Sequence, residues 1–430
     1  MPTVQPFRAL RYAPDAVSDL GAVVAPPYDV IDADERRRLA ARDPHNVVRL
    51  DVPVPEPGDE PDEHYRRAAR LIAAWRSDGT LRRDPRPSLY PYEQVYRVPG
   101  TDVERTRRGF FARVGLEPFG PGIRRHERTL AAPKEDRYRL LRATGVNTSP
   151  VVGLYEDPSG TAPTWLVSIG DEPVADLTDD DGVRHRLWRV AADDDRVAGL
   201  LDSVGTCPIT IADGHHRYET ALRYRDERMI GSAEVDPAWA SILMLLLEPV
   251  AGPVTVLATH RVLTGIAGSD HGGLDLLPDL FDLRPSSRAE LARGFAPGAL
   301  APGGRGRFGL WTRDGGFVLS ARRAAFEADL PPGGPAVRRL DVTLAGIAIE
   351  RLTGIDADAT EGGRIRYTKD PAEAFSWVDD RVDGADAALL LEPTPAAEIV
   401  AVAAAGDVMP QKSTYIYPKA LTGLVINPLE

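Results

Sequence analysis

The sequence predicts a mixed α/β fold. Apolar residues recur at helical spacing in some segments and at every second position in others, and the two kinds of segment alternate along the chain. The chain has 430 residues, which corresponds to two or three domains of about 100 to 200 residues each. We expect an N-terminal α/β segment at residues 1–88, a central phosphate-binding region at 89–260 and a C-terminal α/β domain at 261–430 that contributes a loop to a cleft.

The N-terminal segment contains one clear loop and one clear helix. Residues 52–62 hold four prolines among acidic residues, which predicts an exposed loop. Pro61 then stands at a typical helix start, and apolar side chains recur with helical spacing up to Gly79. From Leu89 the period changes to two, and a polar turn near Gly100 separates two such runs. This pattern predicts a β-hairpin that ends near Leu116.

The rest of the chain alternates between short strands and helices. Strands are predicted at residues 151–155, 165–169, 183–190, 208–212, 364–368 and 387–391. Helices are predicted at residues 134–143, 193–203, 215–228, 340–352 (closed by Gly354) and 396–404. The stretches 295–306 and 330–335 are rich in Gly and Pro, which predicts surface loops.

Charge and cysteine content restrict the partners and the compartment. The formal net charge is −12, which disfavours nucleic acids and anionic membranes as partners. Cys207 is the only cysteine, so a disulfide framework and a multi-cysteine zinc site are excluded. No apolar run approaches the roughly 18 residues of a membrane span. We therefore expect a cytoplasmic protein that acts on a small molecule, and the oligomeric state is left open.

The segment Asp213-Gly214-His215-His216-Arg217 is the strongest candidate for a site. It follows a short apolar strand and opens a helix, so the first helical N–H groups lack partners and favour a phosphate. Asp213 as a simple N-cap is the structural alternative. The density of titratable groups at one strand-to-helix junction favours a functional site.

Three further segments carry candidate polar residues. His126 and Glu127 combine a histidine with a carboxylate, and Lys134 follows at a helix start, which suits a general base and a phosphate contact. A helix start with solvated ion pairs is the alternative interpretation. The second segment is a proline-containing tail, in which Lys412, Ser413, Thr414 and Lys419 are predicted to contact phosphate or substrate. The third is a stiff loop, in which Tyr28 and Asp29 are predicted to contact the substrate.

Several common motifs are absent from the sequence. There is no Walker-type Gly-rich loop, no His-Glu-x-x-His motif and no dinucleotide-binding fingerprint followed by an acid. P-loop kinases, zinc peptidases and Rossmann dehydrogenases are therefore disfavoured.

The segments 26–30, 126–137, 213–217 and 409–414 together resemble the bacterial family catalogued as domain of unknown function 1015, over residues 6–425. The turn at Asp213 is in addition similar to the phosphate-binding turn of the ParB and sulfiredoxin superfamily, which includes kinases of free serine. The resemblance implies a ParB/sulfiredoxin-like central α/β region.

Residues 213–217 match the phosphate-binding turns of different members of this superfamily at different positions. Gly214, His216 and Arg217 match the sulfiredoxin turn, in which a cysteine stands in place of His215. Serine kinases carry Asp-Gly-His-Thr-Arg, so only His216 departs from their pattern. The resemblance therefore favours nucleotide or phosphate binding over sulfiredoxin chemistry.

We interpret the protein as a phosphotransferase that moves a phosphoryl group from ATP, ADP or pyrophosphate to a hydroxyl of a small metabolite, with free L-serine as the best single acceptor. Glu127 would accept the hydroxyl proton, His126 would assist it, and Asp213 would position the substrate or Mg²⁺. Contacts to the donor phosphates are predicted for Gly214, His215, His216, Arg217, Lys134, Lys412 and Lys419. Contacts to the acceptor are predicted for Tyr28, Asp29, Ser413 and Thr414.

Two other functions remain open at this point. One is a nucleotide-binding switch without turnover, as in ParB-type clamps. The other is a metal-dependent hydrolase that uses His126, His215, His216 and Asp213, although adjacent histidines do not form the separated i, i+4 pair of a typical metal-binding helix. We predict no resident metal ligands.

Overall fold

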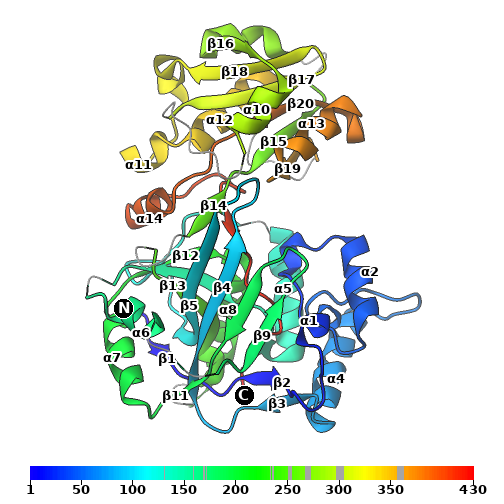
Figure 1. Ribbon diagram of the computed structural model, residues 1–430, viewed down its shortest axis with the longest axis vertical. Coiled ribbons are helices and arrows are strands. Elements are labelled where there is room, and N and C mark those ends of the chain that lie inside the picture. The colour runs from blue at the N-terminus through cyan, green and yellow to red at the C-terminus, as the bar shows by residue number, and fades with distance from the viewer. Residues whose placement is uncertain are drawn as a thin grey trace.

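The structure is a computed structural model of the chain. The residues that it describes are 1–129, 131–157, 159–167, 170, 172–232, 234, 237–249, 254–266, 273–296, 305–355 and 363–430. Figure 1 shows two lobes, each with its own β-sheet, joined by a narrower region. We call them the large lobe and the small lobe.

The large lobe is built on a mixed sheet of ten strands in the described part of the chain. The strand order is β6-β12-β8-β13-β5-β4-β10-β9, with β1 paired to β5 and β11 to β4. This sheet occupies the lower half of Figure 1. Its strands are β1 (Val4–Gln5), β4 (Ser88–Arg97), β5 (Glu104–Gly115), β6 (Ile123–Arg124), β8 (Val151–Tyr155), β9 (Ala175–Thr178), β10 (Arg184–Leu187), β11 (Val190–Ala191), β12 (Ile209–Asp213) and β13 (Ser241–Leu247).

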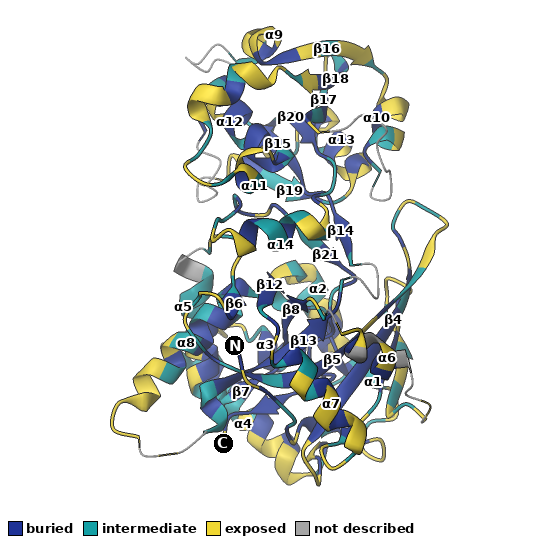
Figure 2. Ribbon diagram, turned by 90° about the vertical axis from the view of Figure 1, so that its left-hand side faces the viewer, coloured by how far each residue is buried: buried dark blue, intermediate teal, exposed yellow. Residues whose placement is uncertain are grey.

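The predicted hairpin is confirmed as β4 and β5, which pair antiparallel from Tyr90 opposite Phe111 to Arg97 opposite Glu104. The neighbouring strands β8 and β13 are buried along their whole length. Figure 2 shows these central strands in dark blue beneath helices whose outer faces are exposed. Because both faces of the sheet are covered, the sequences of these strands are continuous runs of apolar residues.

Helices surround this sheet and contribute the remaining core of the large lobe. The predicted helix after residue 61 is α4, and it buries Tyr65, Ala68, Ile72 and Trp75 at helical spacing. The helices of the large lobe are α1 (Leu20–Val23), α2 (Ala33–Arg42), α3 (Val48–Asp51), α4 (Glu63–Ser77), α5 (Ala131–Thr144), α6 (Thr161–Val167), α7 (Asp195–Val204) and α8 (His215–Met229), with the 3₁₀ helix η1 (Tyr28–Val30).

One predicted strand, at residues 165–169, is wrong. The chain forms helix α6 there, and residues 168 and 169 lie outside the described part. The Asp157 carboxylate accepts the backbone N–H of Ala162 at 2.8 Å and caps the first turn. Ala162, Trp165 and Leu166 are buried at helical rather than strand spacing. The strand predicted at 183–190 is in fact two strands, β10 and β11, separated at Trp188 and Arg189.

The small lobe contains a second sheet of six strands among the described residues, in the order β16-β18-β17-β20-β15-β19. Helix α12 ends at Gly354, which adopts φ +64°, as the sequence predicts. Most of the loop predicted at 295–306 lies outside the described residues. The elements are β15 (His260–Thr264), β16 (Phe281–Ser286), β17 (Arg307–Thr312), β18 (Gly315–Ala321), β19 (Ile365–Thr368), β20 (Ala385–Leu390), α9 (Leu277–Leu280), α10 (Arg288–Gly294), α11 (Pro335–Arg338), α12 (Asp341–Thr353), α13 (Pro371–Asp379) and α14 (Ala396–Ala404).

The C-terminal segment returns from the small lobe to the large lobe. Backbone bridges join Ala25 to Thr422 and Leu10 to Ile426, so the chain end is buried against the N-terminal segment. Three two-stranded sheets complete the fold: β2 (Leu10–Tyr12) with β3 (Leu81–Arg83), β7 (Val146–Asn147) with β22 (Asn427–Pro428), and β14 (Thr255–Leu257) with β21 (Tyr415–Tyr417).

These elements confirm the mixed α/β class, and the division into three sequence segments stays a prediction. None of the helices in the described ranges combines the length and the apolar character needed to cross a bilayer.

Candidate active site

A cavity of about 470 Å³ is lined by residues of both lobes. The large lobe contributes η1, the loop after β6 and the junction of β12 with α8. The small lobe contributes the junction of β19 with α13, and the C-terminal loop contributes residues 411–419. Cavities of this size hold small molecules and cofactors.

The wall formed by the large lobe centres on the junction of β12 and α8. Gly214 is the N-cap residue and adopts φ +90°, a left-handed conformation that favours glycine. The first backbone bond of the helix runs from the N–H of Tyr218 to the carbonyl of Gly214 at 3.0 Å. The N–H groups of His215, His216 and Arg217 therefore precede the regular helical bonds, at the positive end of a 15-residue helix.

Asp213 is held between two cations. Its Oδ1 lies 2.5 Å from Nζ of Lys419, and its Oδ2 lies 2.7 Å from Nη2 of Arg217. Burial alone would raise the pKa of Asp213, but Lys419 and Arg217 lower it well below the ordinary value. Because both oxygens are in ion pairs, this carboxylate organises the two cations and is a poor proton acceptor.

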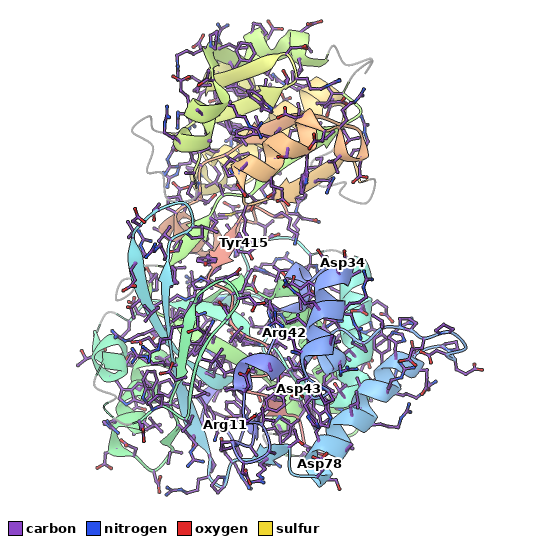
Figure 3. All side chains as sticks on the ribbon, turned by 45° about the vertical axis from the view of Figure 1, so that its right-hand side comes forward. Arg11, Asp34, Arg42, Asp43, Asp78 and Tyr415 are labelled. Carbon is purple, nitrogen blue, oxygen red and sulfur yellow. The ribbon has the colours of Figure 1, made fainter. Side chains whose placement is uncertain are left out.

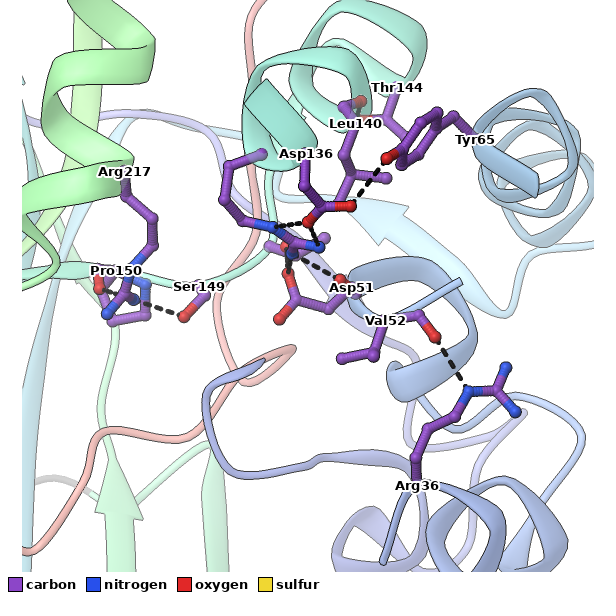
Figure 4. Close-up of polar contacts among 12 residues, drawn as sticks. Arg36, Asp51, Val52, Tyr65, Asp136, Leu140, Thr144, Ser149, Pro150 and Arg217 are labelled. Atoms are coloured by element: carbon purple, nitrogen blue, oxygen red, sulfur yellow. Dashed lines mark hydrogen bonds and ion pairs between the residues drawn. The ribbon is translucent and has the colours of Figure 1, made fainter. Parts of the chain in front are cut away.

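Arg217 anchors the turn to the loop before β8. One guanidinium nitrogen donates to Ser149 Oγ at 2.6 Å and also to the carbonyl of Pro150, as Figure 4 shows. The guanidinium lies against Gly214 so closely that a Cβ there would be 3.0 Å from Nε of Arg217. The Nε itself is buried and has no hydrogen-bond partner among the described residues. Most of the arginine fork is thus used to hold the turn.

Glu127 is a largely buried carboxyl group that lines this cavity. Its Oε1 accepts the backbone N–H of Lys412 at 2.6 Å, and the side chain is 19% exposed. Burial raises the pKa of Glu127 to about 7, against the opposing effect of Lys412. A carboxyl group with this pKa exchanges a proton near neutral pH, which is what general base catalysis on a hydroxyl group requires.

His126 and His215 form a neutral pair in which His126 lies behind the wall and His215 lines the cavity. His126 is fully buried, and its Nδ1 lies 2.6 Å from the carbonyl of Ile211. A carbonyl only accepts, so this contact assigns the proton to Nδ1 and makes Nε2 the acceptor for the hydroxyl of Thr414 at 3.1 Å. Burial lowers the pKa of His126 to about 4 and that of His215 well below its ordinary value. His126 positions the wall and does not line the cavity.

The C-terminal loop is fixed to the large lobe by backbone contacts. The N–H of Met409 donates to the carbonyl of His126 at 2.7 Å. Arg107, which is 2% exposed, donates to the carbonyl of Tyr417 at 3.1 Å and to that of Pro418. Gln94 donates to the carbonyl of Lys419 at 2.9 Å. These bonds place Lys412 and Lys419 at the cavity although they are distant from it in sequence.

Most of the residues singled out in the sequence meet at this one cavity. Those that line it are Tyr28, Asp29, Glu127, Asp213, Gly214, His215, His216, Arg217, Lys412, Thr414 and Lys419. Three others do not line it. His126 lies behind the wall, Lys134 forms a 2.9 Å ion pair with Glu219, and Ser413 donates to the carbonyl of Pro410 at 2.5 Å.

The sequence analysis did not identify the residues that the small lobe contributes. These are Thr259, Tyr367, Thr368, Lys369 and Glu373. They lie on β19 and α13 or just before β15, and no local motif marks them. One signal in the sequence could have identified Lys369. Lysine is rare in this arginine-rich chain, and Lys369 is one of its few lysines.

A divalent cation fits this cavity only in part. Mg²⁺ is usually held by one or two carboxylates together with phosphate oxygens. Asp29 lines the cavity, is exposed and forms no ion pair within the described ranges, whereas both oxygens of Asp213 are already paired. Among the described residues, no group of three or more His, Cys, Asp or Glu side chains is arranged to hold a metal ion. A cation would therefore be bound through the phosphates, with Asp29 as the protein contact.

Comparisons with known proteins give a family and a set of distant structures. A family model described as "Protein of unknown function (DUF1015)" matches residues 4–343. No curated protein matches the chain. Similar solved structures include a free serine kinase in complex with AMP, which is 13% identical with a TM-score of 0.35 and is matched over 74% of this chain and 90% of its own.

Two further solved structures are comparably distant. SbnI from Staphylococcus aureus, with a C-terminal truncation, is 11% identical with a TM-score of 0.36, over 73% of this chain and 85% of its own. A conserved hypothetical protein from Pyrococcus furiosus is 12% identical with a TM-score of 0.33, over 70% of this chain and 92% of its own.

Proposed function

We propose that this chain, which belongs to the DUF1015 family of proteins of unknown function, is a phosphotransferase that moves a phosphoryl group from a nucleotide or pyrophosphate to a hydroxyl of a small metabolite. One observation carries the proposal. The Glu127 carboxyl, whose pKa is raised to about 7, lines the same cavity as the N-terminus of α8 at Gly214. A base for the acceptor and a binding site for the donor phosphates therefore lie together.

The donor phosphates would lie against the first amides of α8. These N–H groups point out of the helix end and carry its positive partial charge, which favours an anion. Lys412 and Lys419 also line the cavity and would neutralise charge that develops on the phosphate oxygens. Asp213 would keep Lys419 and Arg217 in place, through its ion pairs with both.

Transfer would then need a single proton acceptor. Glu127 would take the proton of the acceptor hydroxyl while the hydroxyl oxygen forms a bond to the terminal phosphorus of the donor. The bond between that phosphorus and the bridging oxygen of the donor breaks at the same time. The products are a phosphate monoester and the shortened donor, and protonated Glu127 returns its proton to water. Mg²⁺ held by Asp29 and the donor would supply further neutralisation of phosphate charge.

The proposal also names the acceptor and the donor. The turn from Asp213 to Arg217 resembles that of free serine kinases, which supports free L-serine as the acceptor and ATP, ADP or pyrophosphate as the donor. A cavity of about 470 Å³ has room for a nucleotide and a small acceptor. Cytoplasmic location stays a prediction.

The test is a screen of the purified full chain. Each of ATP, ADP and pyrophosphate is incubated with a panel of hydroxylated metabolites that includes L-serine, and products are identified by phosphorus NMR. A new phosphomonoester signal that depends on both donor and acceptor is the expected result. Tight nucleotide binding without transfer to any acceptor would instead support a nucleotide-binding switch, and absence of both binding and transfer would remove the proposal.

A further inference from the structure

Lysine is rare in this protein, and its few lysines are not evenly distributed. The chain has four lysines and 48 arginines among 430 residues. Three of the four, Lys369, Lys412 and Lys419, line the cavity, although only 21 of the described residues line it. The fourth, Lys134, pairs with Glu219 outside the lining. Every other Lys or Arg position of the chain is an arginine, so three of the four ammonium side chains of the protein lie at the cavity.

The three cavity lysines come from different parts of the fold. Lys412 and Lys419 belong to the C-terminal loop, whereas Lys369 follows β19 in the small lobe and precedes α13. Lys369 Nζ lies 4.9 Å from the centre of the Tyr415 ring, and Lys419 Nζ lies 4.4 Å from it. Figure 3 places Tyr415 where the two lobes meet. One aromatic ring thus contacts lysines that belong to both sides of the cavity.

Two of these lysines lack the usual partner of a lysine. Within the described ranges, neither Lys369 nor Lys412 forms an ion pair with a carboxylate, whereas Lys419 is paired with Asp213. Thr259 also lines the cavity from the small lobe, is 8% exposed, and has a hydroxyl oxygen without a hydrogen-bond partner among the described residues. An anionic ligand in the cavity would supply the charged partner that Lys369 and Lys412 lack.

The chemistry of lysine suits a phosphate chain. An ammonium group is a compact charge with three rotatable donors, whereas the guanidinium of arginine is a planar fork. The arginine at this site, Arg217, uses its fork to hold Ser149, Pro150 and Asp213. The residues that line the cavity include five Lys or Arg and four Asp or Glu, so the lining is close to neutral while the protein as a whole carries a net charge of −12.

We propose that Lys369, Lys412 and Lys419 form a three-lysine subsite for the polyphosphate chain of the ligand, in which Lys369 supplies the contact from the small lobe. This inference rests on the proposed function and adds to it that both lobes bind the donor. It follows that the subsite prefers a diphosphate or pyrophosphate, which can reach both lobes, to a single phosphate.

The test uses inorganic pyrophosphate as the probe and isothermal titration calorimetry as the measurement. Wild-type full chain is compared with Lys369→Ala and with Lys369→Met, which keeps the length of the side chain. Arg313→Ala removes an exposed cation from the turn between β17 and β18 of the same lobe and serves as the control. We expect both Lys369 variants to bind pyrophosphate about 10-fold or more weakly, as loss of a charged hydrogen bond predicts, while Arg313→Ala matches wild type.

Further measurements separate this inference from the proposed function. Wild type should bind pyrophosphate more tightly than phosphate, and Lys369→Ala should reduce that preference. Wild-type affinity in both Lys369 variants, with weakened binding in Lys412→Ala, would show that the small lobe does not contact the donor and would overturn the inference while the phosphotransferase proposal stands. A Lys369 effect on the KM of the acceptor alone would overturn it as well. Failure of wild type to bind any polyphosphate would remove both.

Discussion

Lys419 Nζ and Asp213 Oδ1 lie 2.5 Å apart, although the two residues are separated by 206 positions in the chain. Their side chains are 13% and 14% exposed, so the pair is shielded from solvent. The contact joins the C-terminal loop to the strand-to-helix junction of the large lobe. It also fixes the charge state of both groups, because Asp213 raises the pKa of Lys419 against the opposing effect of burial.

Replacement of Lys419 by Met should destabilise the protein strongly at neutral pH. The change leaves Asp213 with Arg217 as its remaining ion-pair partner, and removal of one member of a buried pair costs about 3 kcal/mol. The pKa of Asp213 is lowered in the folded state, so this stabilisation is present above its unfolded pKa and is lost as the pH falls through the folded value. The difference from wild type should therefore shrink on acidification.

Calorimetric unfolding at pH 7 and at about pH 2.5, below the ordinary pKa of an aspartate, measures this effect. Arg322→Met is the matched control, because its 2.7 Å ion pair with Asp282 is exposed and should contribute less than about 1 kcal/mol. Equal effects of the two substitutions at pH 7 would contradict the assignment of a buried pair.

Glu127→Gln should abolish most turnover and leave donor binding unchanged. The amide cannot accept the hydroxyl proton, and loss of a general base typically lowers turnover by about 10² to 10⁴. The Gln oxygen can still accept the N–H of Lys412, so the loop stays in place. Turnover is measured with the best acceptor and donor affinity by calorimetry. Glu135→Gln, an exposed carboxylate paired with Arg139 and Arg223, is the control that should behave as wild type.

The pH dependence of the reaction should follow Glu127. Since the pKa of this carboxyl is raised to about 7, the base becomes deprotonated as the pH rises, and kcat/KM should increase with a midpoint near pH 7 and level off about one pH unit higher. The histidines do not add a step between pH 6 and 8, because the pKa values of His126 and His215 are both lowered. The residual activity of Glu127→Gln should lack this rise, and a rise that persists in the variant would assign it to another group.

The same raised pKa has a consequence for stability. Burial of Glu127 favours its protonated form in the folded state, so folding is stabilised below the unfolded pKa and this stabilisation is lost as the pH rises through about 7. Glu127→Gln should therefore become more stable relative to wild type as the pH rises from 5 to 8, by roughly 1 to 3 kcal/mol. Thermal unfolding of both proteins across this range checks the sign.

Gly214→Ala should impair donor binding as well as stability. The residue has φ +90°, and a Cβ would stand 3.0 to 3.1 Å from the guanidinium of Arg217, which would have to move. Gly145→Ala is the matched control, since Gly145 also has a left-handed φ, +63°, but nothing lies within 4 Å of its Cβ position. Both changes add backbone strain of about 1 to 2 kcal/mol. Nucleotide affinity by calorimetry should fall only in Gly214→Ala, and an equal fall in both variants would contradict the role of the turn.

The sequence by itself determined most of the local structure. The hairpin of β4 and β5, helix α4, and the junction of β12 with α8 follow from side-chain periodicity, because the alternating or helical spacing of their apolar side chains is present in the sequence itself. The concentration of Asp213, Gly214, two histidines and Arg217 at that junction marked the centre of the cavity. Periodicity does not predict helix α6, because its capping by Asp157 is a contact that the spacing of apolar residues does not record.

Only the tertiary structure decided how the site is assembled. The hydrogen bond from Lys412 to Glu127 spans 285 positions, and the pair of Lys419 with Asp213 spans 206. No local pattern encodes such contacts, because they depend on buried donors such as Arg107 that hold the C-terminal loop in place. The raised pKa of Glu127 and the paired state of Asp213 arise from burial and from neighbouring charges, which exist only once the lobes and the returning C-terminal segment have packed together.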